Sequence, residues 1–140
     1  MHEFQKKILL TQFQDYKVQQ ISRTNKSQFY YDRLKDLKYL NFPQTDFNIN
    51  NIFLDFPIIC EKKNDKKGLF EYLLKKRLDV KGYYYKNCAE EKIYHYANSK
   101  CENSSNIADN ILMLPVHQDI KEHHQNQIIK EIKNFFEIKK

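Results

Sequence analysis

Three consecutive tyrosines followed by a polar turn are the residues of this sequence with the clearest capacity to bind a ligand. Tyr83, Tyr84 and Tyr85 precede the turn Lys86-Asn87-Cys88. Side chains along a strand alternate between its two faces, so Tyr84 would face one way and its two neighbours the other. Such phenols either line a ligand site or extend from a half-buried strand so that their hydroxyl groups reach water. From spacing alone, the half-buried strand is the favoured interpretation.

Nucleophilic catalysis by a thiol is a second chemistry that the residue types allow. A reactive thiolate needs a neighbouring base, and Cys88 with His117 is the candidate pair. Nothing in the sequence around either residue marks a nucleophile, which favours an ordinary loop histidine. The cysteines number 3 and have no CxxC spacing, which argues against a disulfide framework. Free thiols in a reducing compartment are the simpler interpretation.

Metal binding is a third possibility, carried by cysteines and histidines. Cys88, His95 and Cys101 are spaced too widely for the paired ligands of a structural zinc site, and a fourth ligand is not evident. His123 and His124 are adjacent on a predicted helix, so they should point in different directions and not chelate as an i, i+4 pair would. We therefore expect no metal ligands in this chain.

Composition argues against several classes of function. Only two glycines occur, Gly68 and Gly82, whereas loops that cradle phosphates need several glycines so that the backbone can approach the anion. The net charge is +6, but the lysines are interleaved with acids, as in Glu61–Lys67, and no nucleic-acid-binding motif accompanies them. We expect no nucleic-acid partner, and a basic α+β domain that binds nucleic acid is a weaker alternative.

The N-terminal segment is charged and amphipathic. It has neither the apolar core nor the small-residue cleavage site of a signal peptide. No run approaches the roughly 18 apolar residues of a membrane span. These observations predict a cytoplasmic protein with no membrane partner.

Apolar periodicity and turn residues predict an alternation of helices and strands. Residues 1–42 lack proline and glycine and carry apolar residues at near-helical spacing, which predicts one long helix, bent near Thr24. A helix of this length in a small domain needs a second domain or a partner chain to lie against. Further along, strands are expected at 52–60, 80–85 and 111–115, and helices at 66–78 and 120–138.

This order predicts an α+β fold, with a small, mostly antiparallel sheet, helices on one face and a long N-terminal helix. Residues 1–42 are interpreted as an interdomain-type helix and residues 43–140 as a small domain, together one structural unit. Pro57 inside the first predicted strand indicates an edge position or a bulge.

Several segments, taken in order, resemble the C-terminal third of the DegT/StrS family of sugar aminotransferases. The most specific is Ile111–His117, which is similar to the family's strand ending in Leu-Pro-Val-His or Leu-Pro-Val-Tyr. Met1–Gln5 with Leu10–Phe13 is similar to the helix that leads into the family's small domain. Asp79–Tyr85 and Cys101–Ala108 fall where the family has a Gly-Ile…His-Tyr segment and a Cys-Pro-Asn-Ala-Glu turn.

The resemblance implies the small domain of a fold-type I aminotransferase. The intact parent would use pyridoxal phosphate to transfer an amino group from glutamate (or glutamine) to a keto group on a nucleotide-linked sugar, as in cell-surface polysaccharide synthesis. Family members are generally homodimers. By analogy, Tyr84, Tyr85 and Asn87 would approach the sugar, and Met1–Glu3 would lie on the cofactor side.

The departures from the family pattern decide what chemistry this chain is expected to do. Lys6-Lys7 replaces a pair of small residues, and Gln118 stands where the family usually has proline. Met1 falls on a methionine internal to the family, so the Schiff-base lysine and the aspartate at the pyridine nitrogen would lie outside this chain. We therefore expect no catalytic or cofactor-binding residue, no transamination by the chain alone, and a large domain or second copy docked through the first helix. A non-enzymatic remnant or docking module of a split gene is the alternative.

Overall fold

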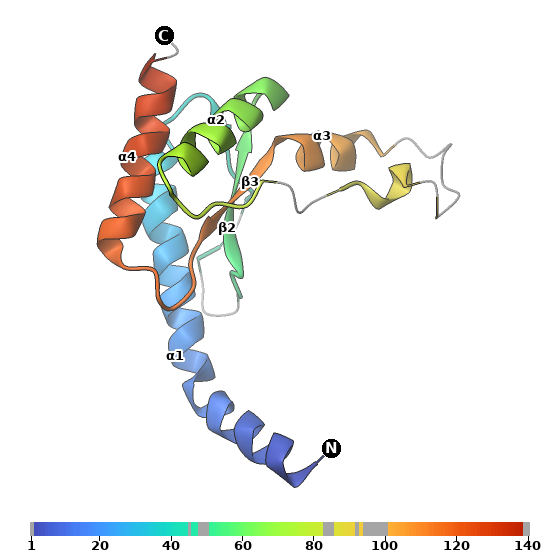
Figure 1. Ribbon diagram of the computed structural model, residues 1–140, viewed down its shortest axis with the longest axis vertical. Coiled ribbons are helices and arrows are strands. Elements are labelled where there is room, and N and C mark those ends of the chain that lie inside the picture. The colour runs from blue at the N-terminus through green and yellow to red at the C-terminus, as the bar shows by residue number, and fades with distance from the viewer. Residues whose placement is uncertain are drawn as a thin grey trace.

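The computed structural model describes residues 2–44, 46–47, 51–82, 86–91, 93 and 101–138, and it confirms the α+β class. Its helices are α1 (Glu3–Leu34), α2 (Lys63–Lys75), the short 3-10 helix η1 (Cys88–Glu90), α3 (Glu102–Asn110) and α4 (Glu122–Ile138). Its strands are β1 (Leu40–Asn41), β2 (Asp55–Cys60) and β3 (Ile111–Pro115). Figure 1 shows α4 beside α1 and α2, while α3 and η1 extend away from the body as an arm.

The sheet is antiparallel, with the strand order β1-β2-β3. Phe56 of β2 lies opposite Leu114 of β3, and alternate residues of β2 are buried, as a strand with one covered face requires. Lys81 forms an isolated bridge to Met113 at the other edge of β3. This bridge is the described part of the strand predicted at 80–85, since residues 83–85 lie outside the described residues.

Pro57 is accommodated without loss of a ladder hydrogen bond. It lies opposite Met113 on β3, and β1 pairs only with Ile59 and Cys60 further along β2. The edge of β2 toward β1 is therefore open at Pro57, which is the kind of edge position that proline tolerates.

The core lies between the sheet and the helices packed on it. The rings of Tyr30 from α1 and Phe56 from β2 are stacked with their centroids 5.9 Å apart. Only the second half of α1 contributes to this core. The largest fully buried side chains of the core are Tyr30, Leu34, Phe56, Ile58, Leu69, Leu73, Leu112, Leu114, Ile128 and Ile132.

The first helix ends at Leu34, earlier than the predicted residue 42. The chain then continues in tight turns, in which the amide of Leu37 donates to the carbonyl of Leu34 and the amide of Leu40 donates to that of Leu37. Leaving the helix there lets Leu40 enter the core and pair with Cys60. Tertiary pairing therefore overrides the local helical periodicity.

A polar contact joins α2 to α4 at the rim of the core. The Tyr72 hydroxyl donates to Oε2 of Glu131 over 2.6 Å, and Nζ of Lys76 lies 3.6 Å from the same oxygen. The hydrogen bond from Tyr72 is the main reason that the pKa of Glu131 lies below its ordinary value, with Lys76 adding to it.

Replacing Gly82 by alanine is expected to destabilise the fold. An alanine Cβ at this position would lie 2.6 Å from Cδ2 of the buried Phe70 ring. Overpacking of this kind costs about 1–3 kcal/mol, measurable by urea unfolding. Gly68→Ala in α2 is the control, because its Cβ would meet the Phe135 ring less closely, with Cζ at 3.2 Å and Cε2 at 3.6 Å, and alanine is the better helix former by about 1 kcal/mol. Equal stability of the two variants would contradict this packing.

Candidate functional site

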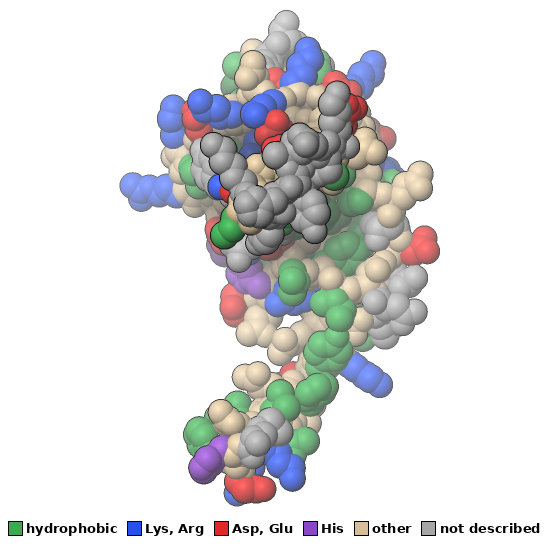
Figure 2. Space-filling view, turned by 90° about the vertical axis from the view of Figure 1, so that its right-hand side faces the viewer, with side chains coloured by type: hydrophobic (Ala, Val, Ile, Leu, Met, Phe, Trp, Pro, Cys, Tyr) green, Lys and Arg blue, Asp and Glu red, His purple; other side chains and the backbone are tan. Residues whose placement is uncertain are grey.

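The first half of α1 extends from the body with no described part of the chain packed around it. Every residue from 2 to 18 is exposed, and Figure 1 shows this part of the helix projecting past the sheet and the other helices. Large apolar side chains nevertheless occupy it, visible in Figure 2 as a row of hydrophobic surface along the helix. We call this the α1 surface; its members are Phe4, Ile8, Leu9, Leu10, Phe13, Tyr16, Val18 and Ile21.

The apolar side chains of the α1 surface do not form one narrow stripe. Ile8, Leu9 and Leu10 are consecutive, and successive residues of a helix are about 100° apart, so these three alone span roughly 200° of the circumference. Phe13 is 63% exposed and Val18 69% exposed. A helix that is apolar on several sides is characteristically buried on several sides. The α1 surface therefore has the properties of a segment that inserts against another folded body.

The inner half of α1 is fixed firmly to the domain. Nη1 of Arg23 donates to the carbonyls of Phe53 at 3.2 Å and Leu54 at 3.1 Å. The hydroxyl of Thr24 donates to the carbonyl of Asn51 over 3.3 Å. These contacts set the direction in which the exposed half of the helix leaves the body.

A cleft of about 600 Å³ lies between the α1 surface and the loop that follows β3. Lys26 fixes the loop, because its Nζ donates to the carbonyls of His117 at 2.8 Å and Gln118 at 3.1 Å. Nδ1 of His117 lies 3.9 Å from Oδ2 of Asp119. The cleft is thus polar on the loop side and mixed on the helix side; its lining is Leu9, Gln12, Phe13, Asp15, Tyr16, Gln19, Arg23, His117, Gln118 and Asp119.

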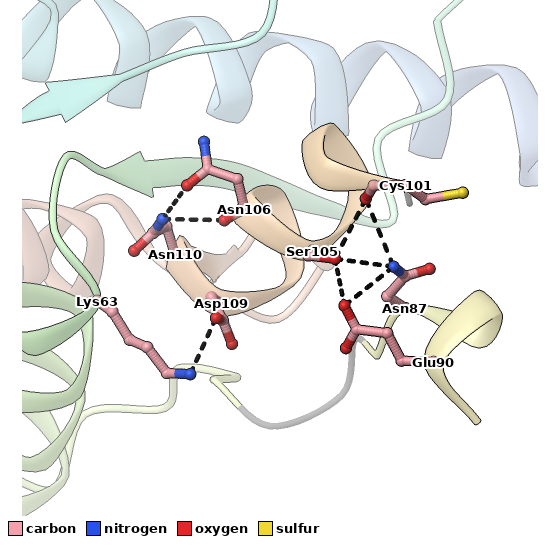
Figure 3. Close-up of polar contacts among 8 residues, drawn as sticks. All are labelled: Lys63, Asn87, Glu90, Cys101, Ser105, Asn106, Asp109 and Asn110. Carbon is pink, nitrogen blue, oxygen red and sulfur yellow. Dashed lines mark hydrogen bonds and ion pairs between the residues drawn. The ribbon is translucent and has the colours of Figure 1, made fainter. Parts of the chain in front are cut away.

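Asn87 is the described member of the predicted sugar-contacting group, and its side chain joins η1 to the N-terminal part of α3 (Figure 3). Its Nδ2 donates to Oγ of Ser105 at 2.9 Å and to Oε1 of Glu90 at 3.3 Å, and its Oδ1 accepts from the amide of Ala89 at 3.1 Å. Ser105 also donates to Glu90. Tyr84 and Tyr85 lie outside the described residues, so their role as substrate contacts stays a prediction.

The rest of the arm is tied to α2. Nζ of Lys63 lies 2.9 Å from Oδ2 of Asp109, and Nδ2 of Asn110 donates to the carbonyl and to Oδ1 of Asn106 (Figure 3). The ion pair of Lys63 with Asp109 links α3 to α2, whereas the contacts of Asn110 lie within α3 itself. Sequence reasoning missed the pairing of Lys63 with Asp109, because these residues lie 46 positions apart in the chain.

The fold does not bring the thiol candidate Cys88 and the histidine His117 together. Cys88 lines a small hollow beside α3, whereas His117 lines the cleft beside α1. His95 lies outside the described residues, and within the described ranges no three histidines, cysteines or acids gather as metal ligands.

The adjacent histidines of α4 differ from the prediction. Instead of pointing apart, His123 and His124 bring their Nε2 atoms within 3.0 Å of each other. Both side chains are exposed, in the first turn of α4. Spacing along the helix predicted divergent Cβ directions, but imidazole rings reach far enough for their tips to converge.

The residues described here do not fit pyridoxal phosphate as a bound cofactor. The lining of the cleft contains no lysine. Lys26 beside it directs its amine at two carbonyls, and its pKa lies below the ordinary value chiefly because burial disfavours the charge, with repulsion from Lys121 and Arg23 adding. Imine formation needs an amine free to attack the cofactor aldehyde. No step of cofactor chemistry is therefore assigned to this chain.

The described helices also include none with the length and apolar character to cross a bilayer. The fold is thus a small α+β lobe with a long N-terminal helix whose outer half carries exposed apolar side chains.

Comparison with known proteins identifies the family. The chain belongs to the DegT/DnrJ/EryC1/StrS aminotransferase family, whose model matches residues 1–133. The resemblance noted in the sequence is thereby confirmed. No curated protein sequence matches this chain.

Solved structures share the fold. A DegT DnrJ EryC1 StrS aminotransferase from Brucella abortus superposes with a TM-score of 0.77 at 23% identity, over 91% of this chain and 34% of that one. NtdA from Bacillus subtilis with bound cofactor PMP superposes with a TM-score of 0.74 at 15% identity, over 86% of this chain and 29% of that one. Helicobacter pylori PseC, an aminotransferase involved in the biosynthesis of pseudoaminic acid, superposes with a TM-score of 0.75 at 20% identity. The match covers 91% of this chain and 35% of that one. The chain thus spans about a third of these proteins and corresponds to part of an aminotransferase.

Proposed function

We propose that this chain supplies the small domain of a pyridoxal-phosphate-dependent aminotransferase that transfers an amino group from glutamate to a keto group on a nucleotide-linked sugar. The observation that carries the proposal is the family match over residues 1–133, together with a coverage of only 34% of a solved relative. The bare α1 surface supports it, since a large domain docked there would cover the exposed apolar side chains.

In this proposal the large domain binds the cofactor and the present chain completes the substrate site. The cofactor, held by a lysine-bearing large domain, acts as the electron sink for the transfer of the amino group. The present chain docks through the α1 surface and closes one side of the substrate site. The hydrogen bonds of Asn87 to Glu90 and Ser105 hold the turn that follows Tyr84 and Tyr85. The two phenols would donate hydrogen bonds to sugar hydroxyl or phosphate oxygens.

The chain alone is expected to be inactive and not to form a specific imine. Mixed with pyridoxal phosphate, it should give no imine absorbance, and borohydride followed by mass spectrometry should find no stoichiometric adduct at one lysine. The reason is that the cleft lining contains no lysine and the amine of Lys26 is engaged.

Reconstitution separates the enzyme from a non-enzymatic docking module. A lysine-bearing large domain of the same family, encoded in the same genome, is added, and formation of 2-oxoglutarate from glutamate is followed with nucleotide-linked keto sugars as acceptors. The large domain alone is the control. A tight complex that stays inactive with every acceptor would favour the docking module, and a single-lysine adduct on the isolated chain would overturn the division of work.

A further inference from the structure

We propose that the outer half of α1, residues 3–18, is a marginally stable helix whose folding is completed when the large domain docks, so that its helix propensity sets the affinity of docking. The carrying observation is that every residue from 3 to 18 is exposed, whereas the buried residues of α1 lie between Thr24 and Leu34. The inference rests on the proposed function, because the large domain is the body that would complete the helix.

The side-chain contacts that hold the outer half in its helical form are local. At its start, the amide of His2 donates to Oε1 of Gln5 over 3.1 Å, which is a capping contact. Further along, the hydroxyl of Thr11 donates to the carbonyl of Lys7 over 3.0 Å, and a contact of this kind slightly destabilises a helix. Neither contact reaches beyond the helix, and no side chain of residues 3–18 is buried by the described part of the chain.

The amino-acid composition of the outer half places it close to the balance between helix and coil. The inner half of α1 is fixed to the domain and acts as the nucleus, so each outer residue contributes only a propagation factor, which is near 1 for good helix formers. Seven of residues 3–18 are weaker formers, because their side chains are β-branched, aromatic or able to hydrogen-bond the backbone. They are Phe4, Ile8, Thr11, Phe13, Asp15, Tyr16 and Val18. The outer half therefore frays from its free end towards the anchored residue Arg23.

The side chains that weaken the helix also provide its contact surface. Five of the seven weaker formers are apolar members of the α1 surface, so burying them against the large domain supplies the free energy that local propensity lacks. The affinity of a partner for a conformation that is only partly populated is reduced by the populated fraction. A change in the helical fraction of the outer half should therefore change the affinity even when every contact with the partner is kept.

The test compares alanine with glycine at two exposed positions of the outer half that do not belong to the α1 surface. One variant carries Gln14→Ala with Lys17→Ala, and the other carries Gln14→Gly with Lys17→Gly. Both variants lose the same side chains, so they differ in helix propensity, for which alanine is the best residue and glycine among the worst. Gln28→Ala and Gln28→Gly are the control pair, because Gln28 is exposed on the inner half, which the domain holds in place.

Calorimetric titration with the lysine-bearing large domain measures the affinity, and backbone carbon chemical shifts measure the helical fraction of the lobe alone by nuclear magnetic resonance. Residues 3–18 of the parent lobe should show shifts between the helix and coil values, and the glycine variant should lie nearer to coil. The glycine variant should bind about 5- to 30-fold more weakly than the alanine variant, which is the difference in propensity at one to two positions. The two Gln28 variants should bind equally well.

The outcomes separate this inference from the proposed function. If the parent binds the large domain but the alanine and glycine variants bind with equal affinity, or if residues 3–18 are fully helical in the lobe alone, this inference is wrong and the proposed function stands. Failure of the parent chain to bind the large domain would overturn the proposed function, and this inference with it. Urea unfolding of each variant checks that its core is intact.

Discussion

Phe13→Asp is expected to abolish productive association with the large domain while leaving the isolated lobe folded. The Phe13 side chain is 63% exposed, and its ring lies 6.2 Å from that of Tyr16 at the centre of the α1 surface. A carboxylate buried there on docking would have no described partner, and the change should cost about 2–4 kcal/mol of association free energy, the range of an interface hot spot. Calorimetric titration of the lobe with the large domain measures this loss.

The neighbouring residue provides the matched control. Gln14 is also exposed on α1, and Gln14→Asp introduces the same charge one position away without removing an aromatic side chain. We expect a clearly smaller effect on binding from Gln14→Asp. Neither change should alter the free energy of unfolding of the lobe by more than about 0.5 kcal/mol, as is usual for exposed positions. If both variants bind equally well, the α1 surface is not the contact.

The largest loss of stability is expected from Phe56→Ala. The ring is fully buried, and it lies near the rings of Tyr30, Phe42 and Phe47 at centroid distances of 5.9, 6.1 and 6.5 Å. Removing it leaves a cavity lined by aromatic side chains and costs about 3–5 kcal/mol. That loss approaches the whole stability of a marginal domain, so urea unfolding should show a much lower midpoint or no folded baseline.

Leu54→Ala, at the residue just before β2, provides the comparison for that core position. Leu54 is 73% exposed, so its truncation should change the free energy of unfolding by no more than about 0.5 kcal/mol. A small effect of Phe56→Ala, comparable to that of Leu54→Ala, would mean that the aromatic cluster is not the centre of the core.

The sequence predicted the regular elements well where side-chain burial is local. The apolar run 111–115 became β3 with its predicted limits, and the stripe of Ile128, Ile129 and Ile132 became the buried face of α4. The strand expected at 52–60 begins at Asp55, and the helix expected at 66–78 became α2, which begins three residues earlier and ends at Lys75. Periodicity contains this information because it reports which face is covered.

What the sequence did not predict depends on long-range contacts. The end of α1 at Leu34 is set by pairing of Leu40 with Cys60, far along the chain. The helix α3 is not among the predicted helices, and its described side-chain contacts with other segments come from Lys63 of α2 and from Asn87. The convergence of His123 and His124 depends on side-chain rotamers, which spacing along a helix does not report.

The sequence predicted a long helix that needs a partner, but not which residues form the α1 surface. The absence of proline and glycine from residues 1–42 indicated a long helix in need of a partner. The sequence did not show which part of this helix the domain itself covers. That boundary depends on hydrogen bonds from Arg23 and Thr24 to carbonyls of residues 51–54, which lie far along the chain. Residues 2–18 are exposed in the structure and form the part of the helix that the proposed large domain would cover.

Hydrogen–deuterium exchange along α1 tests the central claim most directly, measured on the lobe alone and with the large domain at saturating concentration. In the lobe alone, amides of residues 3–18 should exchange quickly, since no tertiary contact protects them, while those of residues 24–34 should exchange slowly. With the large domain present, the first group should become protected. Protection of residues 3–18 in the monomeric lobe, or no change when the large domain is added, would contradict the account.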